Sequence, residues 1–302
     1  MGIFLNLTIN GVSLAAILFL VSAGLSLIFG LMGVLNFAHG SFVLWGAYSW
    51  YAAYINTHSF WLALLVAFLT GAVLGALTER IFMRNLYQRP LSQILVTLGL
   101  GLVLQQLVVA IWGQIPEYPG QLPEFSRTFV AGDVSITSFR IFGIGAGLVT
   151  LVVVWVLLRF TRIGLIVRAG VENPTMVRAL GINVSLVFLG VFALGSALAA
   201  LGGSLYGNWQ FAISTDMGQN VLLLAIIIVV LGGLGSYLGS AVGALIIGLA
   251  QEYVPYYASQ VPHLDPSVQT SAASLVSLAI LVVILLVRPT GLMGINVEPG
   301  EH

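Results

Sequence analysis

The chain has 302 residues, of which 59% are hydrophobic and 7% are charged, and its ten basic and ten acidic residues give a formal net charge of zero. The mean hydropathy of +1.06 excludes an ordinary soluble domain, because globular surfaces are rich in charged side chains. The absence of cysteine and lysine excludes disulfides, thiolate metal sites, a Walker A lysine and a Schiff-base lysine. Composition therefore predicts an all-α polytopic membrane protein that needs another chain if ATP drives it.

Uncharged apolar runs predict a single transmembrane domain, residues 1–302, with eight or nine membrane segments. Most runs have the length that a helix needs to cross the hydrocarbon core, roughly 20 residues. Two stretches, 32–56 and 232–251, are interrupted by glycines. In chain order the runs are 7–31, 32–56, 59–78, 92–113, 141–158, 186–206, 220–235, 240–251 and 271–287.

Arginine positions predict which loops face the cytosol, because cytosolic loops of membrane proteins are enriched in basic residues. The loop 114–140 carries two arginines and lies an odd number of spans from both basic loops. We therefore expect it outside, with Val134–Thr137 as a short strand. The tail 289–302 should be cytosolic, and the N-terminus is outside only if 32–56 fully crosses. The eight arginines assigned to the cytosol are Arg80, Arg84, Arg89, Arg159, Arg162, Arg168, Arg178 and Arg288.

The first interrupted stretch contains Asn36 and His39, one helical turn apart in the sequence GLMGVLNFAHGSFVLWGAY. Unwound backbone at membrane depth is tolerated only inside protein or along a cavity, and polar side chains are costly against lipid. Two interpretations follow: the two residues line a pathway or hinge, or they form a hydrogen-bonded packing pair. We favour packing, because buried polar groups usually have hydrogen-bond partners.

The second interrupted stretch, 232–248, repeats glycine at the four-residue spacing that lets helices pack closely. The alternative interpretation is a transport path, because paired interrupted segments mark such paths in some transporters. Hinge or packing roles are assigned to Gly40, Gly232, Gly235 and Gly239.

The other polar residues within the predicted segments are neutral amides and hydroxyls, and no carboxylate is central. This argues against a proton-coupled carrier, which usually places an ionisable group at mid-membrane. Four scattered histidines without adjacent carboxylates argue against a metal site. No hydrolase motif is present, so no catalytic residue is assigned. The candidates for a translocation path are Asn36, His39, Gln105, Asn208 and Gln210.

A basic loop, 159–183, contains the signals for a short helix on the predicted cytosolic surface. An N-cap residue, a first-turn proline and a C-terminal glycine frame it at Asn173, Pro174 and Gly181. Apolar residues on one side of this helix can contact a soluble partner. The residues assigned to that contact are Glu172, Asn173, Pro174, Met176, Val177, Arg178, Leu180 and Gly181, with Met176, Val177 and Leu180 as its apolar part.

Three separated motifs cover much of the chain: GLSLIFGLMGVLNFAHGSFVLWGAY at 24–48, RAGVENPTMVRALGIN at 168–183 and RPTGLMG at 288–294. With the glycine-rich stretch at 232–248, they resemble the permease subunits of branched-chain amino-acid ABC importers, the LivH/LivM type. The resemblance implies a second permease, identical or homologous, two cytosolic ABC ATPases that use ATP and Mg²⁺, and an external solute-binding protein. It implies no cofactor on this chain, a prokaryotic cytoplasmic membrane, and a coupling helix within Glu172–Gly181.

The function expected from this resemblance is ATP-driven import of branched-chain or related hydrophobic amino acids by alternating access. An alternative is a urea or short-amide ABC permease, which the NFAHG motif at 36–40 also resembles. A stand-alone secondary carrier or facilitator and an assembly subunit without transport activity are further alternatives. The basic loop and the lack of a central carboxylate favour the ABC permease.

Overall fold

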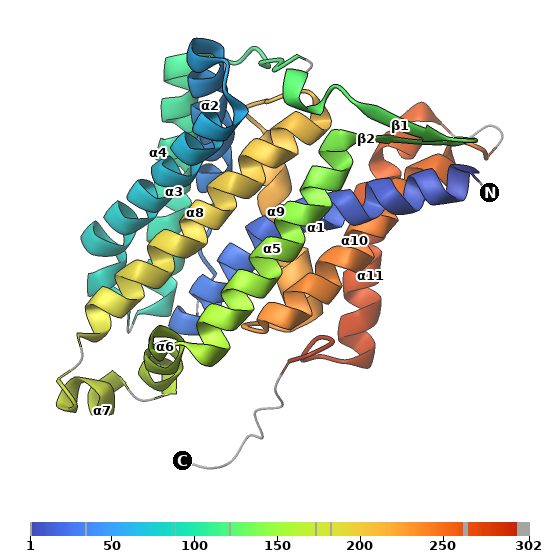
Figure 1. Ribbon diagram of the computed structural model, residues 1–302. Helices are drawn as coiled ribbons and strands as arrows, with labels where there is room; N and C mark the ends of the chain where they lie inside the picture. Colours follow the sequence, from blue (N-terminus) through green and yellow to red (C-terminus); the bar gives the residue numbers. More distant parts are fainter. Residues whose placement is uncertain are drawn as a thin grey trace.

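A computed structural model of the chain describes residues 2–33, 35–87, 89–120, 122–172, 174–181, 183–261 and 265–294. The protein is a bundle of helices with one small β-hairpin at one end (Figure 1). This confirms the predicted helical, polytopic fold. The helices are α1 (Gly2–Met32), α2 (His39–Thr57), α3 (Phe60–Ile81), α4 (Pro90–Trp112), α5 (Ser138–Phe160), α6 (Arg162–Glu172), α7 (Pro174–Ala179), α8 (Val184–Gln210), α9 (Met217–Gly232), α10 (Tyr237–Ala258) and α11 (Pro266–Val287).

Four short elements complete the described part of the chain. The 3₁₀ turns are η1 (Met83–Asn85) and η2 (Pro123–Phe125). Strands β1 (Thr128–Ala131) and β2 (Val134–Thr137) pair antiparallel, with Ala131 opposite Val134. The predicted strand at Val134–Thr137 is therefore confirmed, and Gly132 in the turn has the positive φ of 61° that such a tight connection favours.

Six of the described helices are long and apolar enough to cross a membrane: α1, α4, α5, α8, α10 and the α3 segment extended to Asn85. Their length follows from the uncharged runs, and a helix satisfies its own backbone hydrogen bonds in lipid. The helix α9 and residues 271–287 of α11 are shorter apolar helices. The outward faces of α3, α4 and α5 carry exposed leucines and valines, as a lipid-facing surface requires.

The centre of the bundle is formed by α1 and α8, which contact each other and most of the other long helices. Small residues lie where these helices cross. A Cβ atom added at Gly195 of α8 would lie 2.8 Å from the carbonyl oxygen of Gly24 in α1. Such small residues let helix backbones approach closely, which increases van der Waals packing where lipid supplies no hydrophobic drive.

The N-terminus and the β-hairpin lie on one face of the bundle, named here the hairpin face. The Nδ2 of Asn6 donates to the carbonyl oxygen of Asp133 at 3.1 Å, and the backbone N–H of Ser135 donates to Asn6 Oδ1 at 3.0 Å. The helices α6 and α7 and the segment that follows α11 lie at the opposite end, named the α7 face (Figure 1). The N-terminus therefore shares a face with the loop 114–140.

The first interrupted stretch is a break between α1 and α2, and it returns the chain into the bundle. Gly33 has a positive φ of 67°, and Asn36 Oδ1 accepts a hydrogen bond from the N–H of Ala38 at 3.0 Å. The N–H of Phe37 donates to Thr97 Oγ1 of α4 at 3.3 Å. This unwound backbone is thus hydrogen-bonded within the protein, which is the condition for tolerating it at membrane depth.

The second interrupted stretch is a tight turn between α9 and α10. Gly233 and Gly235 have positive φ values of 106° and 79°, and Ser236 Oγ caps α10 by accepting from the N–H of Gly239 at 3.1 Å. A Cβ atom added at Gly30, near the end of α1, would lie 3.6 Å from the Cα of Gly235. The end of α1, close to the first break, therefore packs against the turn formed by the second.

Candidate functional site

The first turns of α2 and α9 touch through two glycines. A Cβ atom added at Gly40 would lie 2.5 Å from the carbonyl oxygen of Gly218, and one added at Gly218 would lie 2.6 Å from that of Gly40. Only hydrogen atoms fit at such distances, so any larger residue must push the helices apart. Gly40 thus lies at a close approach of two helices, which is the position that the packing interpretation expects.

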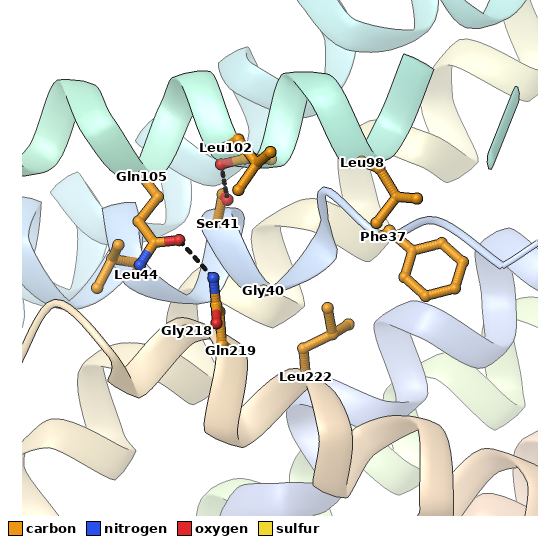
Figure 2. Close-up of a pocket in the computed structure, with 11 residues that line it drawn as sticks. Phe37, Gly40, Ser41, Leu44, Leu98, Leu102, Gln105, Gly218, Gln219 and Leu222 are labelled. Carbon is orange, nitrogen blue, oxygen red and sulfur yellow. Dashed lines mark hydrogen bonds between the residues drawn. The ribbon is translucent and has the colours of Figure 1, made fainter. Parts of the chain in front are cut away.

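Beside this crossing lies a cavity of about 320 Å³ between α2, α4 and α9 (Figure 2). Its apolar wall includes Phe37, Leu44 and Leu222, and Gly101 of α4 lies close to α2. The exposed side chains Leu98 and Leu102 of α4 belong to the lining, so the cavity opens at the surface of this chain.

Three neutral polar side chains line the cavity, one from each helix. Gln219 Nε2 of α9 donates to Gln105 Oε1 of α4 at 2.7 Å (Figure 2). Ser41 Oγ of α2 donates to the carbonyl oxygen of Gly101 at 2.8 Å. Gln105 Nε2 in turn donates to the carbonyl oxygen of Thr215 at 3.3 Å. The cavity therefore combines an apolar wall with uncharged hydrogen-bonding groups, which suits a small amphipathic solute better than an ion.

Gln105 is the one candidate for the translocation path that lines this cavity. Asn36 and His39 do not line it and are buried, with 4% and 0% of their surface exposed. The Nε2 of His39 lies 2.9 Å from the carbonyl oxygen of Val21 in α1 and must donate, because that oxygen can only accept. Each side chain therefore makes one hydrogen bond within the protein, while Asn36 Nδ2 and His39 Nδ1 are buried without a partner among the described residues, so the choice between packing and pathway stays open.

Asn208 and Gln210 lie at the far end of α8, near the hairpin face. Asn208 Nδ2 donates to the carbonyl oxygen of Ser204 at 2.8 Å, and Gln210 Nε2 donates to the hydroxyl of Tyr206 at 2.7 Å. Asn208 lines a different pocket, and Gln210 lines neither that pocket nor the cavity between α2, α4 and α9. The proposed path residues are therefore not brought together.

Sequence reasoning missed Ser41, Gly218 and Gln219. A weak signal was present for two of them, since Ser41 directly follows the NFAHG motif and Gln219 lies two positions before the apolar run that begins at Val221. What the sequence could not provide was the pairing of Gln219 with Gln105, because the two residues are 114 positions apart on helices joined through several others.

The glycines of the second interrupted stretch hold α9 against α10. Gly232 and Gly239 face each other so closely that a Cβ atom on either would overlap the backbone of the other. Gly235 lies in the turn itself and requires its positive φ of 79°. These positions fit close packing and a sharp turn.

The segment predicted to couple to ATPases, within Glu172–Gly181, forms a helix that begins at Pro174, as predicted, and Gly181 after it has a positive φ of 79°. Met176 and Leu180 are 66% and 74% exposed, but Val177 is only 3% exposed. The expectation that Val177 is offered to a partner is therefore wrong, because its side chain packs into the protein's own core. Asn173 and the side chains of Glu172, Pro174 and Arg178 lie outside the described residues.

The basic loop also contains a second helix that the sequence reasoning did not predict, α6. It contacts α5, α8 and α1, and α7 packs against α6 and α8. Val167 of α6 is buried, with 8% of its surface exposed. The coupling segment is thus attached to three long helices of the bundle.

Comparison with known proteins shows one consistent relationship. The sequence profile of the family described as branched-chain amino acid transport system / permease component matches residues 7–285. The high-affinity branched-chain amino acid transport system permease protein LivH of Escherichia coli (strain K12) is 28% identical over 306 residues, covering 96% of each chain. The corresponding protein BraD of Pseudomonas aeruginosa is also 28% identical, over 308 residues and 96% of each chain. LivM of E. coli (strain K12) is 28% identical over 276 residues, covering 81% of this chain and 63% of LivM. No solved structure matches the chain.

Proposed function

Because the chain belongs to the family of permease components of branched-chain amino acid transport systems, we propose that it is the membrane subunit of an ATP-driven importer of branched-chain or related hydrophobic amino acids. The family and the apolar helices make it a multi-pass protein of the inner membrane. The observation that carries the proposal is the cavity between α2, α4 and α9, whose apolar wall and neutral amides match an amino acid with an apolar side chain.

The substrate passes between this chain and a second permease. The cavity opens at the surface, where Leu98 and Leu102 are exposed, so a second subunit placed there would close it into a path. The similarity of the chain to both LivH and LivM of one bacterium supports a partner that is homologous rather than identical.

Two cytosolic ABC ATPases bind ATP and Mg²⁺ and act on the α7 face, while an external solute-binding protein delivers substrate at the hairpin face. The exposed Met176 and Leu180 supply apolar contacts for an ATPase. The contacts of α6 with α5, α8 and α1 then carry the movement into the bundle. ATP binding drives alternating access only if its affinity differs between the inward- and outward-facing states, since equal affinities shift no equilibrium.

The test is leucine uptake into proteoliposomes that contain the chain with its permease partner, ATPases and solute-binding protein. Gln105→Leu should lower ATP-driven uptake by about tenfold, which corresponds to ~1.4 kcal/mol and to the loss of one or two neutral hydrogen bonds. Gln106→Leu is the matched control, because Gln106 is the neighbouring glutamine on α4 and does not line the cavity. Equal uptake by the two variants, or uptake that follows an ion gradient without ATP, would contradict the proposal.

A urea or short-amide importer is the second candidate, because the polar part of the cavity consists of amides and a hydroxyl that also suit an amide solute. Competition of labelled leucine uptake by excess urea, acetamide and valine separates the two. Competition by valine alone supports the amino-acid importer, whereas competition by urea or acetamide alone supports the second candidate.

A further inference from the structure

A second pocket, of about 130 Å³, lies near the hairpin face between the start of α5, the end of α8 and the loop before β1. Its apolar wall includes Leu122, Phe125 and Phe139. Pockets for drug-sized ligands usually measure roughly 300–1,000 Å³, so this one suits a smaller molecule. The function proposed above does not use it.

Three polar atoms of residues that line this pocket have no hydrogen-bond partner within the described part of the chain. They are Arg140 Nη1, Trp209 Nε1 and Asn208 Oδ1, and each of these atoms is buried. Asn208 as a whole is only 4% exposed. A buried polar atom without a partner destabilises the folded state, and more so if it is charged, so three such atoms on residues of one small pocket favour a ligand that pairs with them. Each atom has less than 1 Å² of exposed surface, so the three side chains must turn toward the pocket to meet that ligand.

The position of Arg140 strengthens this argument. Its guanidinium lies over the Trp209 ring, with Cζ 4.1 Å from the ring centroid, which fixes its orientation. Arg140 is in the first turn of α5, where the helix dipole disfavours a cation and favours an anion beside it. Glu252 of α10 attracts this charge but supplies no hydrogen bond to Nη1.

We propose that this pocket is an amino-acid binding site on the hairpin face, which holds the substrate before it reaches the cavity between α2, α4 and α9. Arg140 Nη1 and Trp209 Nε1 donate to the carboxylate, and Asn208 Oδ1 accepts from the ammonium group. The apolar side chain of the substrate lies against Leu122, Phe125 and Phe139. This inference rests on the proposed function, because the family supplies the amino-acid class of the substrate.

The three atoms offer two donors, one of them charged, and one acceptor, which is the pattern that a carboxylate beside an ammonium group requires. An arginine and an indole N–H are both donors, whereas the free atom of Asn208 is an acceptor only. A simple anion would leave the acceptor unsatisfied. An amide solute could make the three hydrogen bonds, but it would bring no negative charge to Arg140, which then has only the attraction of Glu252. An α-amino acid with an apolar side chain can form hydrogen bonds with all three atoms and place its side chain against the apolar wall of the pocket.

The test uses photo-leucine, a leucine analogue that carries a diazirine in its side chain and keeps both charged groups free. The chain is reconstituted in nanodiscs with its permease partner and ATPases but without the solute-binding protein, illuminated with the probe, and digested for mass spectrometry. Adducts are expected in two separate regions: residues 122–140 with 205–211 at this pocket, and residues 98–105 with 218–222 at the cavity between α2, α4 and α9.

Arg140→Gln should reduce the adducts at the pocket by tenfold or more and leave those at the cavity unchanged. Asn208→Leu, which keeps the shape but removes the acceptor, should reduce them at least threefold. Arg127→Gln is the matched control, because Arg127 is an exposed arginine of the same loop and its replacement changes the net charge equally. Adducts at the pocket that survive both Arg140→Gln and Asn208→Leu, or no adducts there in the unaltered protein, would overturn the inference.

Competition with unlabelled compounds keeps the inference testable even if Arg140→Gln fails to fold. Leucine should displace the probe from the pocket, whereas leucinamide, without the carboxylate, and N-acetylleucine, without the ammonium group, should be at least tenfold weaker. Equal competition by leucinamide overturns the role of Arg140. If the pocket instead receives an acidic side chain of the solute-binding protein, free photo-leucine will not label it. The proposed function is judged separately, by the ATP-driven uptake of the Gln105→Leu variant.

Discussion

Gly40 and Gly218 bring the first turns of α2 and α9 into backbone contact, and the cavity lies beside this contact. The polar side chains Ser41 and Gln219 directly follow these glycines in the chain. Their positions therefore depend on how closely the two helices approach. A single added carbon atom at the crossing would push α2 and α9 apart and so displace both polar side chains and the apolar lining of the cavity.

Gly40→Ala is expected to destabilise the protein by about 1–3 kcal/mol, the usual range for an atom inserted into a well-packed core. The new Cβ would lie 2.5 Å from the Gly218 oxygen and 2.9 Å from the Cβ of Leu222. Thermal unfolding in detergent, followed by circular dichroism, measures the effect.

Gly99→Ala is the control for this substitution. Gly99 is in α4, and a Cβ atom there would meet nothing within 4 Å. Because alanine favours a helix by up to about 1 kcal/mol over glycine, this variant should be as stable as the unaltered protein or slightly more stable. Equal melting temperatures for the Gly40 and Gly99 variants would show that α2 and α9 can move apart at this crossing without loss of stability.

The C-terminal end of α9, at the α7 face, is capped by hydrogen bonds from the segment that follows α11. The N–H of Leu292 donates to the carbonyl oxygen of Leu231, and the N–H of Met293 to that of Gly232, each at 2.9 Å. The last carbonyls of a helix lack partners within the helix, so the RPTGLMG motif closes this end from outside. The motif is thus part of the bundle rather than an unattached tail.

Gly291→Ala should loosen this closure. Gly291 has a positive φ of 80°, and a Cβ atom there would lie 2.6 Å from the carbonyl oxygen of Val230. Strain of this kind costs of order 1–3 kcal/mol. Hydrogen exchange measured by mass spectrometry should become faster in residues 228–236, while Met293→Ala, at a half-exposed side chain, should leave the exchange unchanged. Identical exchange in the two variants would count against the capping role.

The helix α7 presents a mixed surface, with Leu180 beyond its end exposed and Val177 within it buried. In a Val177→Pro variant, the proline would interrupt α7 and the loss of the valine side chain would leave a cavity in the core. A loss of transport could then come either from a lost contact with a partner or from a destabilised fold. A substitution at Leu180 tests the contact with a partner more directly.

Leu180→Glu should reduce the recovery of ATPases with the purified chain by at least fivefold without lowering its melting temperature. Leu180 is 74% exposed, so a charge there costs little in the folded chain but opposes an apolar contact. Co-purification followed by quantitative mass spectrometry measures the recovery. The control is Leu165→Glu, at a leucine of α6 that is 61% exposed. A comparable loss for both variants would assign the effect to charge on this face in general.

For the whole molecule, the sequence predicted the helical segments well, because uncharged runs of suitable length have few alternatives in a membrane. It also located the two breaks, since glycine and Asn36 mark them. It failed where an outcome depends on tertiary packing. Val177 is buried because α7 packs against α6 and α8, and Gln105 of α4 forms a hydrogen bond with Gln219 of α9. No local pattern contains that information.

The two faces of the molecule differ in charge, and this sets the expected orientation. Most arginines belong to the α7 face and the loops beside it, whereas the hairpin face has Arg127 and Arg140. The positive-inside rule therefore places the α7 face and the C-terminal segment in the cytosol and the N-terminus outside.

Single cysteines introduced at exposed positions will test this orientation, and each variant will carry one thiol because the chain has no cysteine. Asp133→Cys at the hairpin tip should react with a membrane-impermeant maleimide in intact spheroplasts. Leu180→Cys and Met293→Cys should react only after lysis. Labelling of Met293→Cys before lysis would reverse the predicted orientation.

The central place of α1 has a consequence for biosynthesis. Two of its main packing partners, α8 and α10, begin at Val184 and Tyr237, so they leave the ribosome well after α1. Until α8 and α10 are inserted, the surface of α1 that contacts them in the folded protein is exposed to lipid. The backbone of α1 helps it to tolerate this exposure, since Ser22 Oγ donates to the carbonyl oxygen of Leu18 within the same helix, at 2.9 Å. Because α8 and α10 cover α1 only later, a chain stalled before α10 leaves α1 in the membrane with small, close-packing residues that can still pair with other proteins.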